Sequence, residues 1–295
     1  MAAEHMLRLT RNILRRLIIV GIFVIAGGLL SASLVRFSPG FGVEEREMDN
    51  RLSPQSIQAI KDSHQEERAL LPFYMGFLAG ILRGDLGESH SFSSPIKELL
   101  RQRWRTSFHS LLFGLPFAWG TVFLVTSALI IVRNPGLSIL ASSIAGALLS
   151  VPIAMVAFFS AGIGQSAGFA LTLAIVPVLF RYVRNILENS FCKTHVIAAR
   201  GKGISAARMF CWHVLPTALP QVFGLVGVSV SMAIGALIPI EYLCDSPGIG
   251  QLALQAALAR DLPLLVSLTV IVTAVIMLAT MVADFFGDCL TGRAV

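Results

Sequence analysis

The chain has 295 residues, of which 55% are hydrophobic and 14% are charged, and its mean hydropathy is +0.75. Soluble domains usually carry about 25% charged residues, so this composition excludes an ordinary soluble enzyme and indicates an integral membrane protein. The net charge of +6 is explained by basic anchors beside anionic lipid headgroups. We therefore expect the lipid bilayer, and no nucleic acid, among its partners.

Six apolar segments are candidates for crossing a hydrocarbon core of roughly 30 Å, which takes about 20 residues of helix. They are 17–35, 107–132, 137–162, 166–180, 217–243 and 263–286. The fourth is short, so its helix must continue past Arg181 or lie where the membrane is thinner. The sequence predicts an all-α polytopic membrane protein with six transmembrane helices.

Basic residues set the expected orientation, because short cytoplasmic loops are enriched in Lys and Arg. Four arginines precede the first span, and six basic residues follow the fourth. Both regions should face the cytoplasm, with both termini inside. The expected parts are a cytoplasmic N-terminus with the first transmembrane helix, 1–35, an external segment, 36–106, and a membrane core, 107–295.

The external segment contains three local signals. Ser53 and Pro54 are typical of the first turn of a helix, and the apolar stretch 71–82 predicts a second helix. The run R-G-D-L-G-E-S at 83–89 has two glycines, which favour a tight turn. An amphipathic stretch, 96–105, then leads into the second span.

The loop at 186–216, after the fourth span, is basic and rich in alanine. Ala198 and Ala199 favour helix and allow close backbone approach, while Gly203 permits a sharp turn between two helical pieces. A loop this long and ordered suggests a docking surface for a cytoplasmic partner. The alternative is an amphipathic loop at the membrane surface, and these residues alone do not decide between the two.

The chain lacks the residue patterns of several chemistries. No G-x-x-x-x-G-K-[ST] phosphate-binding motif is present, and the four cysteines have no C-x-x-C spacing. We therefore expect no catalytic residue, metal site or cofactor in this chain. Ion-coupled carriers usually place ionisable residues near the bilayer centre, and the six span centres have none.

Small residues and prolines inside the spans have two possible explanations. They either mark broken helices around a transport site or form kinks and close-packing points, which are more common. The prolines and glycines concerned are Pro116, Pro152, Pro177, Gly227 and Gly235. The fifth span also has a small-residue face suited to close helix contact, formed by Gly224, Gly227, Ser229, Ser231 and Gly235.

Several short motifs follow one another along nearly the whole chain. They are L-S-P-Q-S-I from Leu52, L-R-G-D-L-G-E-S from Leu82, A-A-R-G-K-G from Ala198, H-V-L-P from His213, P-G-I-G from Pro247 and A-R-D-L-P from Ala259. In their order and spacing, these motifs resemble those of the inner-membrane permease subunits of ABC importers, in the oligopeptide, dipeptide and nickel branch.

This resemblance implies a bacterial inner-membrane permease that moves peptides or a related small solute. Its expected partners are a cytoplasmic ATPase, which uses ATP and Mg, a second homologous permease and an external solute-binding protein. The residues expected to couple to the ATPase are Ala198, Ala199, Arg200, Lys202, Gly203, Ile204 and Met209. The residues expected to contact the external protein or second permease are Arg83, Gly84, Asp85, Leu86, Gly87, Glu241, Pro247, Gly248, Gly250 and Asp261.

The chain departs from the family pattern in three places. The frequent acidic residue just before the two alanines is Ile197 here, the connection 161–168 is short, and the frequent D-P-R ending is missing. The alternatives to an importer subunit are an ion-coupled secondary transporter and a non-transporting membrane sensor or scaffold.

Overall fold

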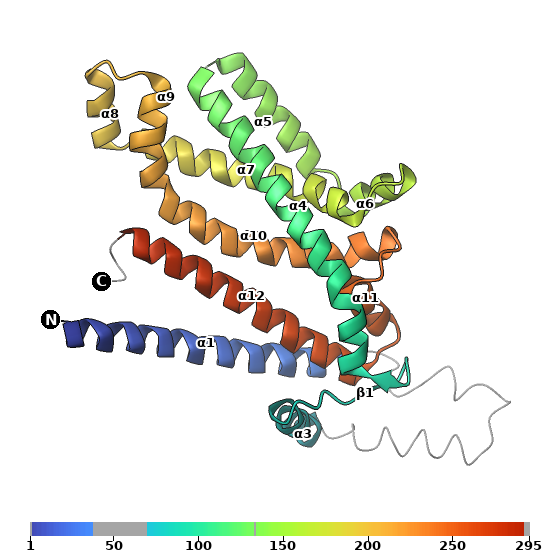
Figure 1. Cartoon of the computed structure of the whole chain (residues 1–295). Coiled ribbons are helices and arrows are strands. Elements are labelled where there is room, and N and C mark those ends of the chain that lie inside the picture. Colours follow the sequence, from blue (N-terminus) through green and yellow to red (C-terminus); the bar gives the residue numbers. More distant parts are fainter. Residues whose placement is uncertain (1, 38–69, 133, 292–295) are drawn as a thin grey trace, which may run out of the picture. The chain divides into compact units, whose positions relative to one another are not determined.

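The computed structural model describes residues 2–37, 70–132 and 134–291, which are mostly helical (Figure 1). In these residues, five helices are long and apolar enough to cross a membrane, and a bent helix pair makes a sixth span if it is counted as one. They coincide with the six predicted segments, which confirms an all-α polytopic protein. The helix start predicted at Ser53 and Pro54 lies outside the described residues.

The helices and strands fall into two compact units: residues 1–18, 105–251 and 275–295 in the first, and 19–104 and 252–274 in the second. The two strands pair antiparallel, with Glu88 opposite Pro95. In chain order the elements are α1 (Ala2–Arg36), α3 (Leu70–Leu82), β1 (Glu88–Ser89), β2 (Ser94–Pro95), α4 (Ile96–Val132), α5 (Pro135–Leu149), α6 (Ile153–Gly162), α7 (Ala167–Phe191), α8 (Thr194–Gly201), α9 (Ala206–Met209), the π-helix η2 (Phe210–Val214), α10 (Leu215–Leu243), α11 (Ile249–Leu258) and α12 (Leu262–Thr291).

The third span, expected over 137–162, is broken at Pro152, one of the prolines for which the sequence left a broken helix and a kink open. Helix α5 ends at Leu149, α6 begins at Ile153, and the two are bent by 92°. The residue at the break is Pro152, whose backbone is extended (φ −58°, ψ 141°). Proline lacks an N–H and disfavours a helical residue before it, so the helix ends ahead of it.

The fourth span is longer than its apolar stretch. Helix α7 runs from Ala167 to Phe191, 25 residues, and so continues past Arg181 as expected. Ser166 caps its first turn, because the Ser166 hydroxyl oxygen accepts a 3.4 Å hydrogen bond from the N–H of Phe169. Its length lets α7 contribute to the core of the first unit at many levels, from Leu171 to Leu187.

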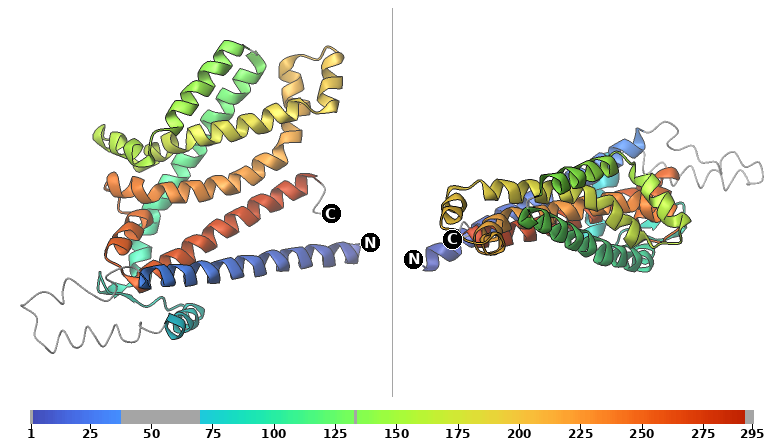
Figure 2. Two further views of the ribbon diagram at one scale, coloured as in Figure 1. Left: turned by 180° about the vertical axis from the view of Figure 1, so that it is seen from behind. Right: turned by 90° about the horizontal axis from the view of Figure 1, so that it is seen from above.

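The core of the first unit lies around α7 and α10, which run side by side in both views (Figures 1 and 2). Helices α5 and α6 also contact α7. Helix α5 differs from its neighbours, because none of its residues is buried. Helix α7 is therefore packed inside the core, whereas α5 lies against the surface of the core.

In the second unit, the apolar helix predicted at 71–82 is α3, which packs through Tyr74. The Tyr74 hydroxyl donates a 2.6 Å hydrogen bond to the carbonyl oxygen of Ile25, and burial raises the pKa of this phenol. A Cβ added at Gly28 would lie 2.6 Å from the Tyr74 hydroxyl and 2.7 Å from Val270. Glycine at this position therefore permits the close approach of Tyr74 and α1.

Candidate functional site

The loop after α7 forms two short helices with a glycine turn between them. Helices α8 and α9 contact each other, as Figure 1 shows, and Gly203 between them has a φ of +74°. Glycine reaches this left-handed region without steric cost, whereas other L-residues do so at a cost. The turn expected at Gly203 is therefore present, with α8 reaching Gly201 and α9 starting at Ala206.

One set of side chains fixes this loop to the protein. Val196, Ala199, Met209 and Phe210 are buried, and Met209 is only 1% exposed. Ile204 is half-buried and packs against the same core. Met209 and Ala199, two of the residues expected to couple to the ATPase, are among those that hold the loop in place.

A second set of side chains is exposed and available to a partner. Ala198, Lys202 and Gly203 are exposed, and so are two large apolar residues, Ile197 at 59% and Trp212 at 74%. Arg200 lies in α8. Trp212 was missed in the sequence, although a large aromatic residue beside basic ones in a loop is a signal that could have identified it.

Polar contacts join the loop to α10. A ring nitrogen of His195 lies 3.2 Å from the Thr217 hydroxyl oxygen, and that hydroxyl donates a 2.7 Å hydrogen bond to the carbonyl oxygen of His213. The contact between His195 and Thr217 therefore links α8 to the start of α10 across 22 positions of the sequence.

The second motif region is the connection between α10 and α11. Glu241 is fully buried, and its carboxylate accepts hydrogen bonds from the N–H groups of Gly250 (2.7 Å) and Gln251 (3.3 Å). These N–H groups belong to the first turn of α11, where the helix offers no backbone acceptor of its own and a negative charge is favourable. Glu241 therefore caps α11 from within the protein.

The glycines of P-G-I-G are explained by this cap. A Cβ at Gly248 would collide with the Glu241 carboxylate, and one at Gly250 would lie 2.7 Å from the Leu237 carbonyl oxygen. Both glycines are buried, whereas Pro247 is exposed. The motif thus brings α11 close to α10.

Asp261 connects two motifs that are far apart in the sequence. It is 2% exposed, and one carboxylate oxygen accepts hydrogen bonds from the Ser89 hydroxyl (2.6 Å) and the Ser91 N–H (2.9 Å). The other oxygen accepts a 3.1 Å bond from the N–H of Leu264 at the start of α12. Asp261 therefore ties the turn after α3 to α12.

The predicted external contact residues divide by exposure. Glu241, Gly248, Gly250 and Asp261 are buried and make contacts inside the chain, and Leu86 is half-buried. The exposed ones are Arg83, Gly84, Asp85, Gly87 and Pro247. The turn itself has the expected form, since Gly84 and Gly87 have φ values of +78° and +76°, and only its exposed part is open to a partner.

The small-residue face of α10 is used partly for packing. A Cβ at Gly227 would lie 2.9 Å from the Thr280 Cα of α12, and the Ser229 hydroxyl accepts a 3.0 Å hydrogen bond from the Trp119 indole N–H. Gly235 is exposed, with open space where a side chain would be. The face therefore serves helix contact at Gly227 and Ser229 and stays open at Gly235.

An ion pair occupies one of the acidic residues near the end of α12. Asp288 pairs with Arg16 at 2.5 Å between carboxylate oxygen and guanidinium nitrogen. The residues that the structure describes contain no cluster of three or more His, Cys, Asp or Glu that could hold a metal ion. This ion pair instead joins the first part of α1 to the last part of α12 within the first unit.

Comparison with known proteins gives a consistent picture. The family model described as "binding-protein-dependent transport system inner membrane component" matches residues 96–294. A metal-staphylopine import system permease protein of Staphylococcus aureus is 30% identical over 123 residues, 42% of this chain but only 39% of the relative's length.

Two relatives match over more of their length. A protein of Brucella suis named as a peptide permease is 25% identical over 310 residues, 93% of this chain and 95% of the relative. The dipeptide transport system permease protein of Lactococcus lactis subsp. cremoris is 22% identical over 258 residues, 79% of this chain and 84% of the relative.

Proposed function

Because the chain belongs to the family of binding-protein-dependent transport system inner membrane components, we propose that it is the permease subunit of an ATP-driven importer. In this role it forms part of the solute pathway and hydrolyses no ATP itself. ATP and Mg are used by a separate ATPase chain, and this chain carries no cofactor.

The observation that carries the proposal is the exposed surface of the α8–α9 loop. Ile197, Ala198, Lys202 and Trp212 are exposed on a segment that is anchored in the core by the buried Val196, Ala199, Met209 and Phe210. Large exposed apolar side chains beside a basic residue suit a protein partner, since Trp is enriched at the centre of interfaces. An ATPase that docks here would push on a loop firmly joined to the spans.

Orientation and further partners follow from the same assignment. The α8–α9 loop and both termini face the cytoplasm, in agreement with the basic residues there. A second homologous permease completes the pathway in the membrane. An external solute-binding protein docks on the opposite side, where the exposed residues of the turn at 83–87 and Pro247 are available.

The substrate class is a small peptide or a related solute. Relatives named for peptides, dipeptides and a metal-staphylopine complex support this class. The mechanism is alternating access: closure of the ATPase pair, transmitted through the loop around Gly203, rocks the spans between outward-open and inward-open states. The external binding protein selects the solute.

The experiment that tests the proposal is purification of the tagged chain from native membranes in mild detergent, followed by mass spectrometry. We expect a P-loop ATPase and a second six-span permease in the eluate. A Trp212→Asp variant should retain at least tenfold less ATPase and the same amount of the second permease. The matched control is Trp104→Asp, since Trp104 is also exposed but lies on α4.

Two outcomes would contradict the proposal. Recovery of the chain alone in a stable homo-oligomer would favour an ion-coupled carrier or a sensor. Equal loss of the ATPase in the Trp212 and Trp104 variants would remove the α8–α9 loop as the docking surface.

A further inference from the structure

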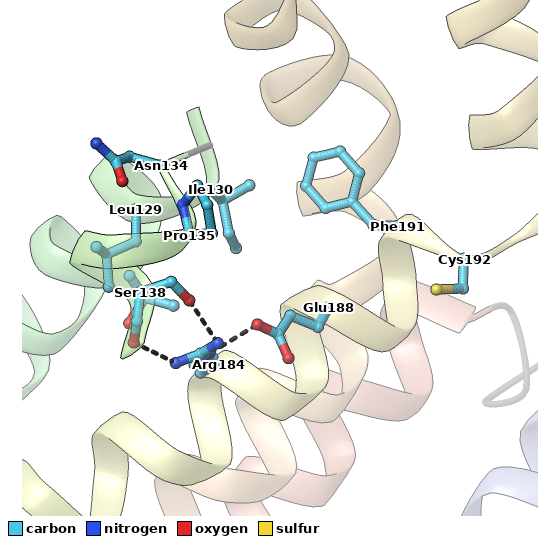
Figure 3. A pocket seen from close by; sticks show the side chains of 10 residues that line it. Leu129, Ile130, Asn134, Pro135, Ser138, Arg184, Glu188, Phe191 and Cys192 are labelled. Carbon is cyan, nitrogen blue, oxygen red and sulfur yellow. Dashed lines mark hydrogen bonds and ion pairs between the residues drawn. The ribbon is translucent and has the colours of Figure 1, made fainter. Parts of the chain in front are cut away.

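Helix α5 is attached to the first unit by little packing. None of its residues is buried, and Arg184 of α7 lines two of the cavities beside it. One, of about 410 Å³, lies among α4, α5 and the end of α7 (Figure 3), and the other, of about 510 Å³, between α5 and α7. Ala141 and Ala145 pack against the core, but because no residue of α5 is buried, its polar contacts also help to fix its position.

Arg184 of α7 supplies such contacts. Its guanidinium donates hydrogen bonds to the Ser138 hydroxyl (2.7 Å) and the Ser138 carbonyl oxygen (3.2 Å), and also to the Ser142 hydroxyl. Ser138 and Ser142 are one turn apart on α5, and Arg184 lines both cavities. The planar guanidinium, with five N–H donors in a fixed fork, can serve all three acceptors at once.

Glu188 orients this guanidinium. The Nε of Arg184 donates a 2.6 Å hydrogen bond to the Glu188 carboxylate one turn further along α7. Figure 3 shows Arg184 lying between Glu188 and Ser138. Because Nε is engaged by Glu188, the two terminal amino groups are directed at α5.

The position of Arg184 along α7 connects α5 to the proposed docking loop. Arg184 lies two helical turns, roughly 12 Å, before Cys192 at the end of α7, and α8 begins at Thr194. A displacement of the α8–α9 loop that moves the end of α7 therefore moves Arg184, and with it the first half of α5.

We propose that Arg184 is a positioning residue that transmits movement of the α8–α9 loop to α5 and, through it, to the broken third span. This inference rests on the proposed function, since the movement is driven by the docked ATPase. The break at Pro152 lets α5 change its angle without carrying α6 along as one rod. Arg184 then connects α7, which moves with the docked ATPase, to α5, the half of the third span that changes its angle.

The neighbouring arginine provides a matched control. Arg181 lies on the same helix, is exposed, and lines only the larger of the two cavities. Among the described residues it makes no hydrogen bond or ion pair with α5. Arg181→Gln and Arg184→Gln remove the same charge from nearly the same place, but only Arg184→Gln removes the hydrogen bonds to α5.

The experiment measures the movement directly. Spin labels are placed at Leu140 of α5 and Val228 of α10, both exposed, in a chain whose four cysteines are replaced by serine. The distance between the labels is measured by pulsed electron resonance in the complex purified with its ATPase, with and without Mg-ATP and vanadate. The parent chain and Arg181→Gln should both show a nucleotide-dependent shift in distance.

Arg184→Gln should lose at least half of that shift while it retains the ATPase and elutes as a single species. The double variant Ser138→Ala with Ser142→Ala should lose part of it, and the addition of Arg184→Gln should then cost less than it does alone. Arg184→Lys, which keeps the charge without the fork, should fall between Gln and the parent chain.

Three results would overturn the inference. A full shift in Arg184→Gln, or a loss equal to that in Arg181→Gln, would show that the bonds to α5 transmit nothing. No shift in the parent chain with its ATPase bound would show that α5 does not move. If the parent chain retains no ATPase, the proposed function itself fails, and this inference fails with it.

Discussion

The α8–α9 loop and the regions around Glu241 and Asp261 use their motif residues in opposite ways. In the loop, the motif residues Ala198, Lys202 and Gly203 are exposed. Around Glu241 and Asp261, the motif acids are buried and cap helices within the chain. The comparison teaches that a sequence motif can mark either a partner surface or an internal packing requirement, and that burial separates the two.

The largest difference is expected between two apolar residues of the loop itself. Met209→Ala should lower the free energy of unfolding by about 3 kcal/mol, since Met-to-Ala changes in cores cost about 2–5. Trp212→Ala should leave it nearly unchanged, because the indole is exposed. Thermal denaturation followed by size-exclusion chromatography measures both. Equal destabilisation by the two variants would contradict the division of the loop into buried and exposed faces.

The P-G-I-G motif should behave as packing. Gly250→Ala should destabilise the protein by about 2 to 3 kcal/mol, because overpacking a close contact costs about 1–3 and the contacted atom is a backbone oxygen. The control is Gly235→Ala on α10, where space is open and alanine favours the helix. Thermal stability in detergent is the measurement. A fully stable Gly250→Ala protein would refute the close approach of α10 and α11.

The buried acid of the second unit should matter more than the exposed acid of its turn. Asp261→Asn should lower the free energy of unfolding by about 2 kcal/mol. Hydrogen bonds to charged groups contribute about 1.5–3 kcal/mol, and the amide of asparagine replaces one acceptor oxygen by a donor. Asp85→Asn, at an exposed side chain bonded to the Gly87 N–H, should cost little. Protease sensitivity of the turn at 83–89 reports the difference, and equal sensitivity would count against Asp261 as its tether.

The smallest effect is expected at the loop turn. Gly203→Ala should destabilise the folded turn by about 1 kcal/mol, because an L-residue in the left-handed region costs about 1–2 kcal/mol and the φ of Gly203 is +74°. Gly201→Ala, in α8 with open space around it, should be neutral or stabilising. Retention of the ATPase by each variant is the readout, and a stronger defect at Gly201 would reverse the assignment of the turn.

Local signals made part of this structure predictable. Each span is a long apolar run, and the turns at Gly84, Gly87 and Gly203 follow from glycine alone. The break of the third span was harder to predict from the sequence. Of the three prolines Pro116, Pro152 and Pro177, the first and last lie inside unbroken helices, and Pro152 lies at the break. Helix α7 around Pro177 is packed in the core, which compensates for the missing hydrogen bond, whereas α5 has no buried residue to hold a continuous helix together.

The roles of the acidic motif residues were beyond local signals. Asp261 meets Ser89 across 172 positions of the chain, and no spacing in the sequence reports that contact. Asp261 follows Arg260, as in an exposed loop, whereas Glu241 lies between Ile240 and Tyr242 near the end of α10, and neither setting indicates a helix cap. Their burial depends on how distant segments pack, and sequence patterns carry little information about such contacts.

The π-helix η2 joins the docking loop to a span, and its geometry has a consequence for insertions and deletions. A π turn accommodates one residue more than an α turn. Removing one residue within 210–214 would let the backbone run as α-helix from Ala206 into α10. Since each helical residue turns by about 100°, the α8–α9 pair would then rotate about the α10 axis by roughly that angle. The direction in which Ile197 and Lys202 face is therefore set by a single surplus residue.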